Sequence, residues 1–78
     1  MTLEEIIEMF PEEEFLTADG FDGAIVGVEP NSMRLVYDRD KMIGILMTDE
    51  EMEEIDAIEY LEYNTWNAYV GEKTPIFI

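Results

Sequence analysis

Charge is spread so unevenly along this chain that its middle third stands out as the natural structural centre. The sequence has twenty Asp and Glu residues against four Lys and Arg, a formal net charge of −16 over 78 residues. Seven acids and no base fall in residues 1–20, and nine acids and one base in residues 48–78, whereas residues 21–47 are close to neutral. We therefore expect one small domain spanning residues 1–78, with acidic helices around a near-neutral centre.

The first ten residues predict a short helix. Thr2 and Glu5 have the spacing of a capping box, in which each side chain satisfies the other residue's backbone N–H. Pro11 then ends the helix, because proline cannot continue the hydrogen-bond ladder. The apolar residues between these signals follow helical spacing: Leu3, Ile6, Ile7 and Phe10.

A turn-rich connection then leads into two stretches that predict a β-hairpin. Residues 24–28 and 33–37 place apolar side chains at alternate positions, and "PNS" between them supplies the turn. Gly27 within the first strand indicates a bulge or a close helix contact. The residues expected to share faces are Ala24, Val26 and Val28 on the first strand and Met33, Leu35 and Tyr37 on the second.

Two further helices follow the hairpin. The segment "DKMIGILM" fits a helix or a strand; we predict a helix, capped by Asp38 or Asp40. Thr48 and Glu51 form a second capping-box pattern, which predicts a long helix from residue 49 to about residue 70, stopped by Gly71. In the shorter helix the inward side chains should be Met42, Ile43, Leu46 and Met47.

The closing segment "TPIFI" reads as a short edge strand, the alternative being an apolar tail outside the fold. The predicted fold is α+β in the order α-β-β-α-α-β, with a small antiparallel or mixed sheet, the hairpin plus the C-terminal strand, packed against helices. The strand order stays open. The core is expected to contain Val26, Val28, Leu35, Ile43, Ile58, Leu61 and Phe77.

The long helix is the most informative part of the sequence, since no base interrupts its acids. Its first-turn acids, residues 49–51, would favour the positive end of the helix dipole. Acids further along, spaced by three residues, would repel one another by a few tenths of a kcal/mol per pair. The predicted buried stripe is Ala57, Ile58, Leu61, Thr65 and Ala68.

The opposite side of this helix is acidic in its first half and aromatic in its second. Aromatic side chains with polar tips anchor many protein interfaces, although here they could instead cover the sheet or another helix. We expect at least two of the three aromatics to be exposed. The residues that we assign to a partner-binding face are Glu53, Asp56, Glu59, Tyr60, Glu62, Tyr63 and Trp66.

The residue types that the chain lacks exclude several kinds of catalytic and metal-binding site. There is no cysteine and no histidine, so disulfides, thiolate metal sites and the commonest general base are excluded. Residues 18–29 resemble a calcium loop only in part, since Ala18 and Gly20 stand where carboxylates are needed. We therefore predict no catalytic residue, no metal site and no cofactor, and a protein that is not an enzyme.

Phosphate contacts require clustered Lys and Arg, so neither nucleic acid nor an anionic membrane is expected as a direct partner. The N-terminus "MTLEEIIEMF" lacks the basic region of a signal peptide, and the apolar stretches are too short to span a bilayer. The expected location is the cytoplasm. A basic protein surface is the natural partner for so acidic a chain.

Two segments, "GFDGAIVGVEPNSMRLVYDRDKMIGILMT" and "EEIDAIEYLEYNTWNAYVGEKTPIFI", resemble a family of short acidic proteins encoded by bacteriophages. In that family a "GFDDAIIG" strand precedes a "YD…K…IEILM" segment, and an "EEAIEYFEFN" helix leads to "GAYVGEKTPIF". The closing "NAYVGEKTPIFI" is the most specific part, and the chain departs from the pattern at Gly23 and Asn67. The resemblance implies a phage origin and a place in the host cytoplasm, but no activity and no site residues.

Two interpretations of function follow. In the first, the chain is a phage accessory protein that binds a basic surface of a host protein, its carboxylates standing in for phosphates as a nucleic-acid mimic or inhibitor. In the second, it is a small structural or regulatory domain, working as a homodimer through an apolar strand edge, and its acidity only keeps it soluble. The dependence of binding on salt distinguishes the two interpretations. Binding by a mimic should weaken steeply with ionic strength, whereas a hydrophobic homodimer should not.

Overall fold

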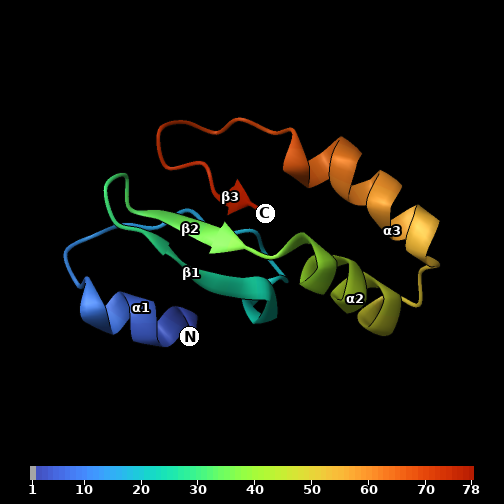
Figure 1. The fold of residues 1–78 in the computed structure, drawn as a ribbon, viewed down its shortest axis with the longest axis horizontal. Helices are drawn as coiled ribbons and strands as arrows, with labels where there is room; N and C mark the ends of the chain where they lie inside the picture. Colours follow the sequence, from blue (N-terminus) through green and yellow to red (C-terminus); the bar gives the residue numbers. More distant parts are fainter. Residues whose placement is uncertain (1) are drawn as a thin grey trace.

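The computed structural model describes residues 2–78 and has the predicted order of elements (Figure 1). Strands β1 and β2 are antiparallel, and β3 joins β2 in parallel, so the sheet is mixed with the order β1-β2-β3. The small α+β fold is therefore confirmed. Its helices and strands are α1 (Leu3–Met9), β1 (Ile25–Glu29), β2 (Arg34–Tyr37), α2 (Arg39–Asp49), α3 (Glu54–Leu61) and β3 (Ile76–Phe77).

The capping box at the start of α1 is confirmed. The Glu5 N–H donates to the Thr2 hydroxyl oxygen at 3.2 Å, and the Thr2 N–H donates to the Glu5 carboxylate at 3.0 Å. The bond from the Thr2 backbone N–H to the carboxylate lowers the pKa of Glu5, and the Thr2 side chain adds a smaller effect in the same direction. Ile6 is fully buried, and α1 lies beside β1 (Figure 1). The helix thus covers one edge of the sheet.

The hairpin forms with a bulge at the predicted glycine. Ile25 pairs with Tyr37, but the next pair joins Gly27 to Val36, so one extra residue lies on β1 between them. That residue, Val26, is 37% exposed, and its neighbour Ile25 is buried instead. The predicted burial of Val26 is wrong because the bulge shifts the alternation of β1 by one position.

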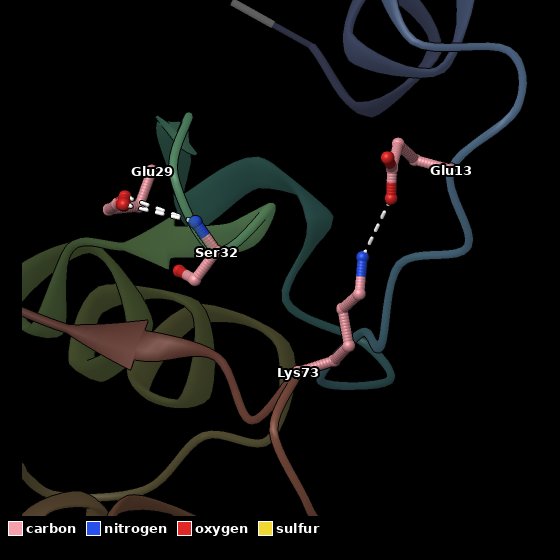
Figure 2. Close-up of polar contacts among 4 residues, drawn as sticks. All are labelled: Glu13, Glu29, Ser32 and Lys73. Atoms are coloured by element: carbon pink, nitrogen blue, oxygen red, sulfur yellow. Dashed lines mark hydrogen bonds and ion pairs between the residues drawn. The ribbon is translucent and has the colours of Figure 1, made fainter.

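The carboxylate of Glu29 closes the hairpin turn, as Figure 2 shows for its contact with Ser32. It accepts the Asn31 N–H at 2.9 Å and the Ser32 N–H at 3.2 Å. Met33, at the end of the turn, has a positive φ of 55° and donates its N–H to the Glu29 backbone oxygen at 2.8 Å. The predicted turn is confirmed, and one of the acids has a structural task.

Helix α2 begins as predicted but ends later. Of the two candidate caps, Asp38 is the one used, because its side chain accepts the Lys41 N–H at 3.0 Å. The helix continues through Thr48 to its last residue, Asp49, so the predicted second capping box at Thr48 is wrong. The chain turns only afterwards, where Glu51 takes a positive φ of 55°.

The acidic helix predicted from residue 49 to about residue 70 is therefore shorter than predicted. Helix α3 begins at Glu54, preceded by Glu53 as a cap residue without a side-chain bond, and folds back alongside α2 (Figure 1). It continues as one π-helical stretch, Glu62–Trp66, and does not reach Val70. Gly71 does have a positive φ, of 115°, but it belongs to a turn that leads into β3.

Side chains from every layer meet in one core. The largest fully buried side chains are Tyr37, Ile6, Leu35, Met42 and Leu61, which come from β2 and all three helices. Of the other predicted core residues, Val28, Ile43 and Phe77 are partly buried against this cluster, and Ile58 is half-buried. Two predicted inward positions are wrong: Met47 is 40% exposed and Ala68 is exposed.

The C-terminal segment belongs to the fold, and three of the four bases hold it there. The Arg34 side chain donates to the Thr74 backbone oxygen, and the Arg39 side chain donates to the Phe77 backbone oxygen at 3.2 Å. Figure 2 shows the third contact, in which the Lys73 ammonium lies 2.8 Å from the Glu13 carboxylate. The predicted terminal strand is therefore confirmed.

Tyr37 connects three parts of the chain that are distant in sequence. Its hydroxyl oxygen accepts the Ala18 N–H at 2.8 Å, and its ring centroid lies 5.6 Å from that of Phe77. Its backbone oxygen accepts the Ile78 N–H at 2.9 Å. The side chain is fully buried, and this burial raises the pKa of Tyr37 above its ordinary value of 10.0.

We predict that Tyr37→Phe destabilises the protein by about 1–3 kcal/mol, the usual cost of leaving a partly buried N–H without its acceptor. Urea unfolding measures this loss. Tyr63→Phe is the matched control, because Tyr63 is 91% exposed, and it should leave the midpoint unchanged.

The same variant has a pH signature. Because the pKa of Tyr37 is raised in the folded state, its stabilising effect is complete below the ordinary value of 10.0 and is lost as the pH rises further. The Tyr37→Phe variant has no phenol to ionise at this position, so its free energy of unfolding should fall less above pH 10.0 than that of the wild type. Equal stability of the variant and the wild type at neutral pH would contradict the bridging role of the hydroxyl.

Deleting residues 74–78 should lower the free energy of unfolding by about 3–5 kcal/mol, because it removes Phe77 from the core together with the third strand. Thermal melting measures the effect. The control Ile78→Ala should melt close to the wild type, because that side chain is 65% exposed. A truncated chain that melts within a degree or two of the intact one would show that the tail contributes little.

Candidate functional site

Four exposed acids on α3 and its flanks make up what we call the acidic face: Glu53, Asp56, Glu59 and Glu62. Beside it, Tyr60 is 44% exposed and Tyr63 is 91% exposed, so the prediction of two exposed aromatics is confirmed. Glu59, Glu62 and Tyr63 share a shallow depression. The acids and the two tyrosines of the predicted partner-binding face therefore all lie at the surface.

Trp66 is the exception among the predicted site residues. It is half-buried; its indole N–H points at the Met42 sulfur at 3.4 Å, and the Arg39 guanidinium lies 4.9 Å from its ring centroid. These contacts join the end of the α3 segment to α2. The helical projection misplaced Trp66 because residues 62–66 are π-helical, which turns later side chains away from their α-helical positions.

No Lys or Arg side chain in the described part of the chain forms an ion pair with the acids of the acidic face. Within residues 2–78 the one ion pair joins Lys73 to Glu13, and the side chains of Arg34 and Arg39 are bonded to the C-terminal segment. Exposed carboxylates that form no ion pair leave a negative potential at the surface. The arrangement thus suits a positively charged partner.

The later end of α2 changes the role of two further acids. Asp49 is the last residue of α2 and Glu50 is its C-cap, so both lie at the negative end of a helix dipole and not, as predicted, in the first turn of the next helix. Carboxylates are unfavourable at this end, where cations are preferred. With Asp19 they line one hollow, whose other wall includes Phe21 and Tyr60.

A second, open cavity of about 270 Å³ adjoins this hollow, and somewhat more of its surface is apolar than polar. It lies between the connection before β1, the end of the α3 segment and the C-terminal segment. Asp19, Phe21 and Tyr60 line both spaces. Sequence reasoning missed the hollow and the cavity because their residues come from four segments that only the fold brings together: the connection before β1, α2, the α3 segment and the C-terminal segment. The remaining lining residues are Thr17, Ala18, Asn64, Thr65, Ala68, Val70, Thr74, Pro75 and Phe77.

We predict that Glu50→Gln is more stable than Glu54→Gln by roughly 0.5–2 kcal/mol. The first change removes an acid from the negative end of α2, whereas the second removes one from the positive end of α3. Both relieve the same general repulsion, so the difference in urea unfolding free energy isolates the dipole effect. Equal stabilities, or the reverse order, would contradict the observed helix boundaries.

None of the helices in residues 2–78 is both long and apolar enough to cross a membrane. No group of three or more Asp and Glu residues in the same range is arranged to hold a metal ion. Comparison of the chain with known proteins finds no matching family, no matching curated protein and no matching solved structure.

Proposed function

We propose that this chain is an acidic binding protein that docks on a basic surface of another protein through the acidic face and its two exposed tyrosines. The observation that carries this proposal is the set of four exposed carboxylates, which form no ion pair within residues 2–78 and lie next to the exposed Tyr60 and Tyr63 along the chain. Complementary charge speeds encounter and selects the partner. Exposed tyrosines offer large contact area with a polar tip.

The spacing of the acids supports a role beyond solubility. Glu53, Asp56, Glu59 and Glu62 recur at every third residue, and Asp56 and Glu59 are a like-charge pair within α3 itself. Such a pair destabilises a helix by a few tenths of a kcal/mol. Acids scattered over the surface would keep the protein soluble without this cost, so binding of a cationic partner is the better explanation for the cluster.

The finer proposal concerns origin and target. The resemblance of residues 20–48 and 53–78 to short phage-encoded proteins supports a phage accessory protein that acts in the host cytoplasm. Its partner would then be a host protein whose basic surface ordinarily holds nucleic acid, and the carboxylates would take the place of phosphates. Occupation of that surface would inhibit the host protein.

The test compares two variants of equal net charge. The face variant carries Glu53→Gln, Asp56→Asn, Glu59→Gln and Glu62→Gln. The control variant carries Glu→Gln changes at four exposed N-terminal positions that take no part in the capping box or the ion pair: Glu4, Glu8, Glu12 and Glu14. Each is used to capture proteins from a bacterial lysate at low and high salt.

The wild type and the control variant should capture the same basic protein at low salt and release it at high salt, since the attraction is screened. The face variant should lose that protein. Capture that is unchanged in the face variant, or that resists high salt, would overturn the proposal. Circular dichroism of both variants confirms that each is folded.

A further inference from the structure

We propose that the docking partner inserts an apolar side chain into the cavity beside Tyr60 and places a neighbouring Arg or Lys cation in the acidic hollow at the end of α2. The recognised element would then be a cation next to an apolar residue in a basic partner. This inference rests on the proposed function and specifies the chemistry of its partner.

The cavity has the size and lining for one apolar side chain. Its volume is about 270 Å³, and a cavity of about 150 Å³ already holds a benzene molecule in other proteins. Phe21, Pro75 and Phe77 give it apolar walls. Val70 at its margin is 61% exposed and Tyr60 is 44% exposed. Exposed apolar side chains around an apolar cavity are typical of a binding site.

The π-helical stretch helps to shape this cavity. Tyr60, Asn64 and Ala68 all line it, although they lie before, within and after residues 62–66. The Asn64 side-chain amide donates to the Tyr60 backbone oxygen at 3.0 Å, which satisfies a carbonyl that α-helical bonding would use. Single π-helical turns often occur at functional sites.

The adjoining hollow supplies charge complementarity. Asp19, Asp49 and Glu50 line it, and no Lys or Arg nitrogen in residues 2–78 lies within ion-pair distance of these carboxylates. The C-terminal end of α2 adds its own negative potential. A cation placed here would be attracted both by the three carboxylates and by the negative end of the α2 dipole. It would also offset the unfavourable position of Asp49 and Glu50.

Tyr60 fixes the distance between the two parts of the partner. It lines both the cavity and the hollow, together with Phe21 and Asp19, so the two spaces share one wall. A cation in the hollow also lies near the tyrosine ring, whose face attracts cations. The apolar group and the cation should therefore come from adjacent residues of the partner.

Three blocked peptides test the proposal by nuclear magnetic resonance titration. The probe is acetyl-Gly-Leu-Arg-Gly-amide. In one control peptide citrulline replaces Arg, which removes the charge but keeps the shape, and in the other Gly replaces Leu. The probe should shift the amide signals of Gly20, Phe21 and Ala68, and each control peptide should bind at least fivefold more weakly. Equal binding of all three peptides would overturn the inference.

Two pairs of variants locate the binding. Asp19→Asn with Glu50→Gln should weaken the probe at least fivefold, whereas Glu12→Gln with Glu14→Gln, of the same net charge and at exposed positions outside both surfaces, should leave its affinity nearly unchanged. Ala68→Leu, at an exposed position, should fill the cavity and abolish the preference for Leu over Gly in the peptide. Signal shifts that centre on Glu59 and Tyr63 would contradict the assigned site.

The two proposals fail in different ways. If the face variant loses its captured partner while the Asp19 and Glu50 variant keeps it at full affinity, the proposed function stands and this inference is wrong. If the peptides bind as expected but the face variant captures its partner unchanged, the cavity is a recognition site and the acidic face is not. Folding of each variant is checked from its amide spectrum.

Discussion

The contacts of Tyr37 hold this small domain together. A chain of 78 residues buries little apolar surface, and here its net charge of −16 opposes compaction. The buried Tyr37 hydroxyl accepts the Ala18 N–H of the connection before β1, and the Tyr37 ring packs against Phe77. The Tyr37 backbone oxygen accepts the Ile78 N–H. The walls of the apolar cavity, which come from the same connection and the same C-terminal segment, stay in place because Tyr37 fixes both.

The few bases determine where the surface is negative. Arg34, Arg39 and Lys73 all contact the C-terminal segment or secure it to the N-terminal connection. The side chains of these three bases therefore stabilise the attachment of the C-terminal segment, which supplies the third strand of the sheet. Within residues 2–78, the acids of the acidic face and of the end of α2 form no ion pair. This links the fold to the proposed function. The bases that hold the third strand in place are not available to neutralise the acids of the proposed binding surface.

Local signals in the sequence were enough for most of the fold. The capping box at Thr2, the bulge at Gly27 and the terminal strand each show in the residue types of a few adjacent positions. The break between α2 and α3 escaped prediction because no glycine or proline marks it, and Glu51 takes the left-handed conformation that glycine would favour. The hollow and the cavity depend on contacts between distant segments, which periodicity does not encode.

Trp66 is placed so that its fluorescence can report on the position of the C-terminal strand. It is the single tryptophan of the chain, and its indole lies between the Met42 sulfur and the Arg39 guanidinium. Arg39 in turn bonds to the backbone of Phe77, which lines the apolar cavity. Any displacement of the C-terminal strand changes the polarity around the indole, so the emission of one native fluorophore reports on the closure of the sheet without an added label.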